Sequence, residues 1–153
     1  MTTILGPVAK NQSAAYPGSA GDLVVNRFEM LIPAGTSTVD IYEIGSLPPN
    51  CRIIDAILDS PVSLGAAGAV ANVAIMTGIA GDATTPRTLV VGSELFSGAA
   101  VSAAAPGAVT RMSAATGFRI APTPVERGIG LQFTTRATGT AGLIALTVFC
   151  ATT

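Results

Sequence analysis

The stretch that most constrains the fold is residues 38–60, where two apolar runs flank a Pro-Pro corner. Before the corner, Val39 and Ile41 alternate with polar neighbours, which is the two-residue period of a half-buried strand. Pro48 and Pro49 lie between the two runs, and they are typical of a sharp turn. The stretch therefore predicts a strand, a corner at which the sheet changes direction, and a second strand.

The rest of the chain repeats this alternation of short apolar runs and Gly- or Pro-rich turns. Further strands are expected over residues 22–32, 70–79, 88–91, 109–112, 117–120, 128–135 and 143–150. In the first of them, one face is expected to meet solvent or an interface at its middle and carries Leu23, Val25, Arg27, Glu29 and Leu31, while the other carries Val24, Phe28, Met30 and Ile32. The turn at 33–35 predicts an antiparallel pair with the strand that follows it, and the turn at 137–142 predicts a hairpin between the last two strands. The Ala-rich residues 97–106 fit a short helix or a loop equally well.

About seven or eight strands, with turns roughly every 8–12 residues, predict a single all-β domain. The expected architecture is a β-sandwich or a jelly-roll-like barrel over residues 22–153, preceded by an extended N-terminal arm over residues 1–21. The last run, 143–150, is almost wholly apolar. It is expected to be a central strand of the sandwich or barrel, or a strand with one face covered by another subunit.

The composition indicates a surface that is covered by other proteins. Charged residues make up 11% of the 153 residues and hydrophobic residues 49%, whereas an average soluble domain has roughly 25% charged residues. Such a surface is either rich in Ser, Thr, Ala and Gly, or covered by copies of the chain or by a partner, and the low charge favours the second interpretation. The nine acidic and eight basic residues are spread singly, so no nucleic-acid partner is predicted.

Residues able to carry chemistry are scarce. The chain has no His, the commonest general base and metal ligand. Asp55 and Asp59 could share a strand face as a carboxylate pair, but the nearby Arg52 favours a solvated surface. No enzyme, and no catalytic, metal-binding or cofactor-binding residue, is therefore predicted. Cys51 and Cys150 are expected to be reduced and buried, with a disulfide as the alternative for a secreted protein.

No membrane segment or signal peptide is predicted. The N-terminus lacks the basic start and apolar run of a signal peptide, which favours synthesis in the cytoplasm. Residues 60–81 carry no charge, but Pro61, Asn72 and four glycines make them a poor membrane helix. They predict a loop followed by a strand instead.

Residues 1–21 predict an arm without a regular element, because Gly and Pro recur through them. A disordered tail is one interpretation. The other is an arm that becomes ordered when it lies across a neighbouring subunit, since its apolar residues exceed what a solvated tail needs. The candidate contact residues for such a neighbour, including one base, are Ile4, Leu5, Val8, Lys10 and Tyr16.

Three stretches resemble the head-decoration, or cement, proteins of tailed bacteriophages. They are the motif SLPPNCRIIDAILDS at residues 46–60, the loop and strand VANVAIMTGIAGDA, and the closing AGLIALTVF. The resemblance implies many copies bound on the outside of a capsid, commonly as trimers, with the major capsid protein as partner. It implies no catalytic residues. A fibre or tail domain that binds a host-surface glycan is the alternative, although such sites favour exposed aromatic residues and the chain has no Trp.

Overall fold

The computed structural model describes residues 2–5, 21–35, 37–60, 69–101, 108–136 and 141–153. Within them the chain forms nine strands and one short 3-10 helix, η1 (Gly117–Arg119). The strands are β1 (Thr3–Leu5), β2 (Leu23–Ile32), β3 (Ile41–Leu47), β4 (Cys51–Ser60), β5 (Val70–Met76), β6 (Leu89–Ala100), β7 (Ala108–Arg111), β8 (Arg127–Thr135) and β9 (Gly142–Thr152).

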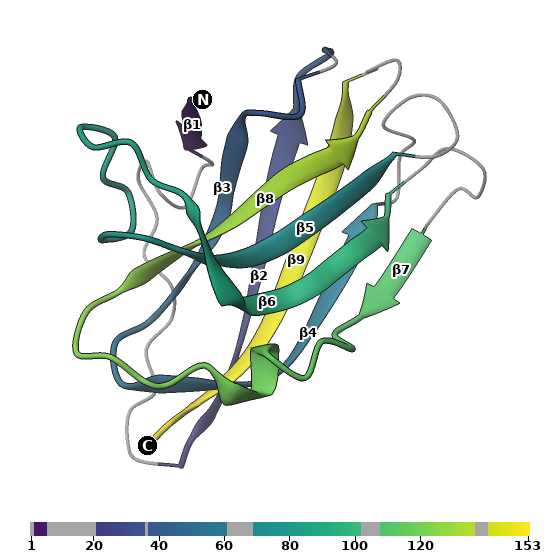
Figure 1. Cartoon of the computed structure of the whole chain (residues 1–153). Coiled ribbons are helices and arrows are strands. Elements are labelled where there is room, and N and C mark those ends of the chain that lie inside the picture. The colour runs from purple at the N-terminus through teal and green to yellow at the C-terminus, as the bar shows by residue number, and fades with distance from the viewer. Residues whose placement is uncertain (1, 6–20, 36, 61–68, 102–107, 137–140) are drawn as a thin grey trace.

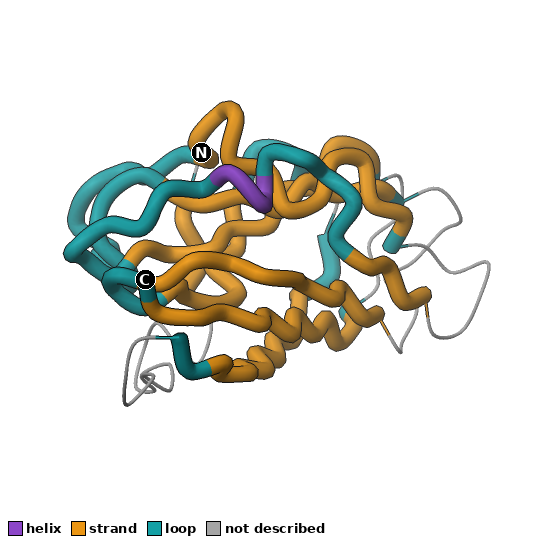
Figure 2. The backbone as a smooth tube through the Cα atoms, turned by 90° about the horizontal axis from the view of Figure 1, so that it is seen from below, coloured by secondary structure: helices purple, strands orange, loops and turns teal. Residues whose placement is uncertain are grey.

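The strands form two sheets that pack as a sandwich (Figures 1 and 2). One sheet has the order β1-β3-β8-β5-β6 and the other β2-β9-β4-β7. Strand β2 pairs with β9, β3 with β8, β4 with β7 and β5 with β6, all antiparallel. In this pairing pattern a long antiparallel hairpin folds over to form two sheets, which is the topology of a jelly roll. The predicted all-β sandwich is confirmed, and it is a jelly roll.

Both predicted hairpins are wrong. Strand β2 pairs with β9 and lies in a different sheet from β3, and β8 likewise lies in a different sheet from β9. Turn residues show where a chain reverses, but they do not show which sheet it enters next. In a jelly roll most connections cross from one sheet to the other, so neighbours in sequence seldom pair.

The Pro-Pro corner is one of these crossings. Strand β3 ends at Leu47 in one sheet, β4 begins at Cys51 in the other, and Asn50 between them has a φ of 55°, in the left-handed region. The expected change of direction is therefore confirmed. The expectation that the first strand is half-buried is wrong, because every residue of β3 is buried. Its second face is covered by the chain itself, as described below.

Three other expectations need correction. Residues 97–100 belong to β6 rather than to a helix, whereas 102–106 lie outside the described residues. Residues 117–119 form the 3-10 helix instead of a strand, and β5 ends at Met76. Strand β6 contains the expected strand 88–91 and continues beyond it, which is one of the two interpretations that residues 92–96 allow, the other being a single helical turn; Gly92 and Gly98 adopt positive φ within it. These glycines shape an irregular strand and do not end it.

The core lies between the sheets and draws on both. Alternate residues of β2 point into it, with Phe28, Met30 and Ile32 buried and Leu31 exposed, as the sequence predicts. Strands β8 and β9 contribute further side chains, namely Ile129, Leu131, Phe133, Ile144, Leu146 and Val148. The core therefore accounts for one face of each sheet and leaves the two outer faces to be explained.

Candidate assembly surfaces

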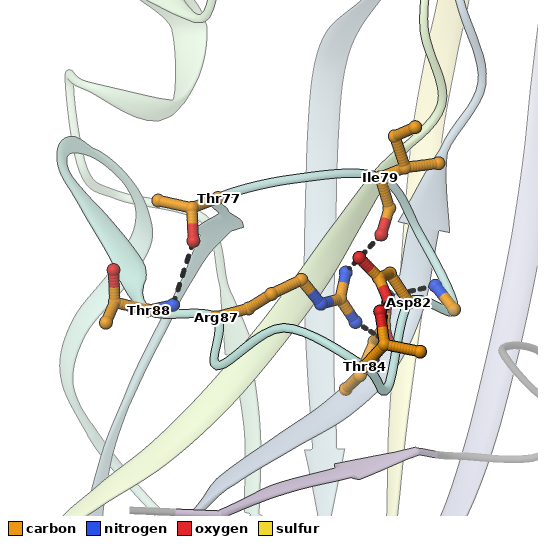
Figure 3. A network of polar contacts seen from close by, with 8 residues as sticks. Thr77, Ile79, Asp82, Thr84, Arg87 and Thr88 are labelled. Carbon is orange, nitrogen blue, oxygen red and sulfur yellow. Dashed lines mark hydrogen bonds and ion pairs between the residues drawn. The ribbon is translucent and has the colours of Figure 1, made fainter.

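The outer face of the β1-β3-β8-β5-β6 sheet is partly covered by the chain's own segment 77–88, which connects β5 to β6 (Figure 3). The backbone N–H of Thr77 donates to Thr88 O at 2.9 Å, and Thr88 N donates to the Thr77 hydroxyl at 3.0 Å. Asp82 accepts bonds from the backbone and hydroxyl of Thr84 at 2.8 and 2.6 Å. The segment is thus closed at its base and ordered at its tip.

A buried ion pair holds this segment on the sheet. The Arg87 guanidinium donates to the Glu43 carboxylate from β3, and the two side chains are 1% and 0% exposed. Arg87 also donates to Ile79 O at 2.7 Å, while Glu43 accepts a bond from Gly81 N at 3.1 Å. Both ions therefore have further hydrogen bonds, which a buried pair needs to offset the loss of hydration.

Glycines in β8 make room for this cover. A Cβ on Gly128 would collide with the Glu43 carboxylate and approach Arg87 Nη1 to 2.9 Å. A Cβ on Gly130 would lie 2.8 Å from side-chain atoms of both Met76 and Leu89. These two glycines let a second layer of side chains pack on the outside of the sheet, and we name this surface the closed face.

The outer face of the β2-β9-β4-β7 sheet lacks such a cover among the described residues, and we name it the open face. Along each of its four strands, the side chains of this face alternate with those that point into the core. The charged ones are Arg27, Glu29, Arg52, Asp55, Asp59 and Arg111. The larger apolar ones are Leu23, Val25, Leu31, Ile54, Ile57, Val109, Leu143 and Phe149.

Ion pairs run across the middle of the open face. Arg27 contacts Glu29 at 3.0 Å on its own strand and Asp59 at 3.1 Å on β4, and it also donates to Thr147 at 3.4 Å. The hydrogen bond to Asp59, more than that to Glu29, raises the pKa of Arg27. Since β9 separates β2 from β4, Arg27 reaches Asp59 across the small Ala145 and Thr147.

A second pair joins β7 to β4, where Arg111 contacts Asp55. The hydrogen bond to that carboxylate raises the pKa of Arg111. Asp55 and Asp59, considered as a carboxylate pair, thus each have an arginine partner on an exposed sheet. Both lie on the outer face as expected, but their side chains are 13% and 21% exposed and thus not fully solvated. Their arginine partners disfavour a role as paired acid and base.

The predicted contact residues of the arm are described only in part. Ile4 lies in β1, which pairs in parallel with β3, and its half-buried side chain packs against the core. Leu5 lies opposite Glu43 in the same short strand. Val8, Lys10 and Tyr16 lie outside the described residues. Of the five residues, the structure therefore places only Ile4 and Leu5, which are neighbours in β1.

The expectation that the first 21 residues contain no regular element is wrong for Thr3–Leu5. Three residues are too few to show a period, and their partner strand is distant in the sequence. The sequence also gave no signal for the pairing of Glu43 with Arg87, because 44 positions separate them. Arg27 and Glu29 were recognisable as an exposed pair from the alternation of β2.

A polar hollow on the β5, β6 and β8 side is the place where a sugar could be sought. It is lined by Asn72, Glu94 and Gln132 among others. Each is already engaged: Asn72 accepts a bond from Gly98 N at 2.8 Å, Glu94 accepts one from Gly92 N at 3.0 Å, and Gln132 donates to Thr38 O at 3.1 Å. Tyr42, the described tyrosine, is buried against Phe133. The hollow therefore gives the glycan alternative little support.

The two cysteines, on the paired strands β4 and β9, are buried and do not form a disulfide. Burial raises the pKa of Cys150 to about 11, with a smaller contribution from Cys51, and burial likewise raises the pKa of Cys51. Neutral thiols of this kind are unreactive. The expected reduced state is tested by counting thiols in the denatured, unreduced protein, where two should be found.

The described residues contain no group of three or more His, Cys, Asp or Glu side chains that could hold a metal ion. None of the helical structure in that part of the chain is long and apolar enough to cross a membrane. Among the described residues, the two outer faces of the sandwich remain the candidate functional surfaces.

Two solved structures of bacteriophage capsids contain chains similar to this one. A protein in the capsid of Ralstonia phage GP4 superposes with a TM-score of 0.86 and is 32% identical in sequence, and the match covers 99% of each chain. A chain in the capsid asymmetric unit of cyanophage Pam1 shares the fold, with a TM-score of 0.61, 21% identity and coverage of 96% of this chain and 99% of that one. No family model and no curated protein matches the sequence.

Proposed function

Since the chain belongs to the family of bacteriophage capsid proteins represented by the Ralstonia phage GP4 protein, we propose that it decorates and stabilises the outside of a capsid. In this proposal it binds between subunits of the major capsid protein, after synthesis in the host cytoplasm. The observation that carries the proposal is the match to a protein of a phage capsid over 99% of each chain.

Two features support decoration over building the shell itself. The residues of the sandwich form one closed body with its own core, so the described domain can fold without a lattice around it. The motif at residues 46–60 also resembles decoration proteins. Copies of the chain are proposed to associate, and the number three comes from that resemblance alone.

The arm, residues 1–21, is proposed to hold the subunit to its neighbours. Its candidate contact residues remain Ile4, Leu5, Val8, Lys10 and Tyr16. Strand β1 occupies only the first part of the arm and lies at the edge of its sheet. The remainder is long enough to reach beyond the sandwich, since an extended chain covers roughly 3.3 Å per residue.

The experiment mixes the purified protein with empty, undecorated capsids and sediments them. We expect the chain alone to form no shells, and we expect it to sediment with capsids at a fixed saturating ratio and to raise their disruption temperature. Closed shells formed by the chain alone would contradict the proposal and assign it to the shell. A glycan array with the isolated protein tests the alternative function.

A matched variant lacking residues 2–20 tests the arm. Among the described residues, the deletion removes the three-residue edge strand β1, and we expect thermal unfolding to remain nearly unchanged while capsid binding weakens. If the shortened protein fails to fold, the arm is part of the core. If it folds and binds as tightly as the full chain, the contact residues lie elsewhere.

A further inference from the structure

We propose that the open face is the surface through which copies of this chain contact one another. The inference rests on the proposed function, because it names the contact that a decorating subunit present in many copies would use. Its occupant is a second copy of the chain that presents the same face, so this contact joins two copies, and a trimer would use a further surface.

The first argument is the apolar surface that the sandwich leaves in water. Five of the eleven large hydrophobic residues exposed in the described chain lie on this one face. They are Leu23, Val25 and Leu31 on β2, Ile54 on β4 and Val109 on β7, which are 47–65% exposed. Leu23, Val25 and Ile54 lie toward one end of the face and Leu31 toward the other, with the ion pairs between them. Five exposed apolar side chains on one sheet face still favour an interaction surface, whereas single exposed hydrophobic residues are ordinary.

The second argument is charge, and it selects the occupant. The face carries three arginines and three acids. They are interspersed, and the contacts Arg27–Glu29, Arg27–Asp59 and Arg111–Asp55 already pair five of the six. A neutral surface of alternating sign meets a copy of itself without net repulsion, and an arginine of one copy can bond to carboxylates of the other. A partner of strong net charge would gain no such match.

The third argument is area. Ten-residue strands such as β2 and β4 are roughly 33 Å long, and four strands span roughly 19 Å, so the face covers at most about 600 Å2. Two surfaces of this size bury about 1,200 Å2 in total, which is the lower limit of stable, specific interfaces. The contact between copies should therefore be reversible and depend on protein concentration.

The closed face provides the internal contrast. There the chain covers its own sheet with segment 77–88 and satisfies the buried charge within one molecule. The open face has ion pairs of the same chemical type, but its central pair, Arg27 and Glu29, is 46% and 51% exposed. It is the face that still lacks a cover in the described part of the chain.

The test places a carboxylate among the apolar side chains without disturbing the core. Val25→Glu and Leu31→Glu change side chains that are 51% and 65% exposed on the open face. Val39→Glu and Val91→Glu are matched controls, since these valines are 58% and 92% exposed away from it. Native mass and light scattering across micromolar concentrations give the oligomeric state, and thermal unfolding checks that each variant is folded.

We expect wild type and both controls to associate, and we expect both open-face variants to dissociate at least roughly tenfold more readily. A monomeric wild type, or open-face variants that associate as wild type does, would overturn the inference. Variants that remain oligomeric but lose capsid binding would overturn it too, because the face would then meet the shell. A monomer that still sediments with capsids would sink this inference and leave the proposed function standing.

Discussion

The two outer faces of the sandwich use the same pair of groups, arginine and carboxylate, in opposite surroundings. On the closed face, Glu43 and Arg87 are almost wholly buried, and both make further hydrogen bonds to the backbone of segment 77–88. On the open face, Arg27 and Glu29 remain about half exposed. The difference indicates that a buried ion pair holds a segment of the chain in place, whereas an ion pair exposed to water leaves its surface available for contact with another molecule.

The largest effect should come from breaking the buried pair. Replacing Arg87 with Met keeps much of the side chain but leaves the Glu43 carboxylate buried without its partner. We expect the free energy of unfolding to fall by about 3–5 kcal/mol, measured by chemical denaturation. The double variant Arg87→Met with Glu43→Gln is the control, and it should recover part of the loss because no uncompensated charge remains.

If Arg87→Met cost no more than an exposed substitution, the closed face would not depend on its ion pair. Segment 77–88 would then be held on the sheet by its other hydrogen bonds, which include Gly81 N to Glu43 and Ala80 N to Glu126 O. The comparison between the faces would lose its basis.

A smaller effect should follow from filling the space beneath that pair. Gly128 has no positive φ, so Gly128→Ala is acceptable to the backbone, but the new methyl group would collide with the Glu43 carboxylate. We expect a loss of about 1–3 kcal/mol in unfolding free energy. Thr135→Ala, at an exposed position of the same strand, is the control and should change stability by less than about 0.5 kcal/mol. Equal stability of the two variants would show that the pair can shift without cost.

How much the sequence predicts depends on the range over which a signal acts. The alternation in β2 predicted its buried and exposed sides correctly, because successive residues of a strand point to opposite faces of the sheet. Pairing partners were mispredicted at 33–35 and at 137–142, since both turns lead into the opposite sheet. Glycines at 92 and 98 resembled breaks, although they bend one long strand.

The candidate surfaces show the same limit. The low charge and the exposed face of β2 were visible in the sequence and led to an expectation of association. The cover of the closed face was not visible, because Glu43, Arg87 and Gly128 come from three distant segments and meet only in the folded sheet. Nothing in the local pattern of β3 distinguishes a carboxylate that faces water from one that faces an arginine.

The smallest effect should come from the open face. Arg27→Ala removes contacts to Glu29 and Asp59 that remain in water in the single chain, so we expect the free energy of unfolding to fall by less than about 1 kcal/mol in dilute solution. Added salt should shrink the difference further, because it screens exposed charges. The same substitution should cost more at concentrations where copies associate, since the open face would then be buried and its acids would lose their partner. Unfolding measured at two protein concentrations separates these regimes. If the loss of unfolding free energy is small and identical at both protein concentrations, the open face is an ordinary solvent-exposed surface. If Arg27→Ala in dilute solution costs as much as Arg87→Met, the chain already covers this face itself.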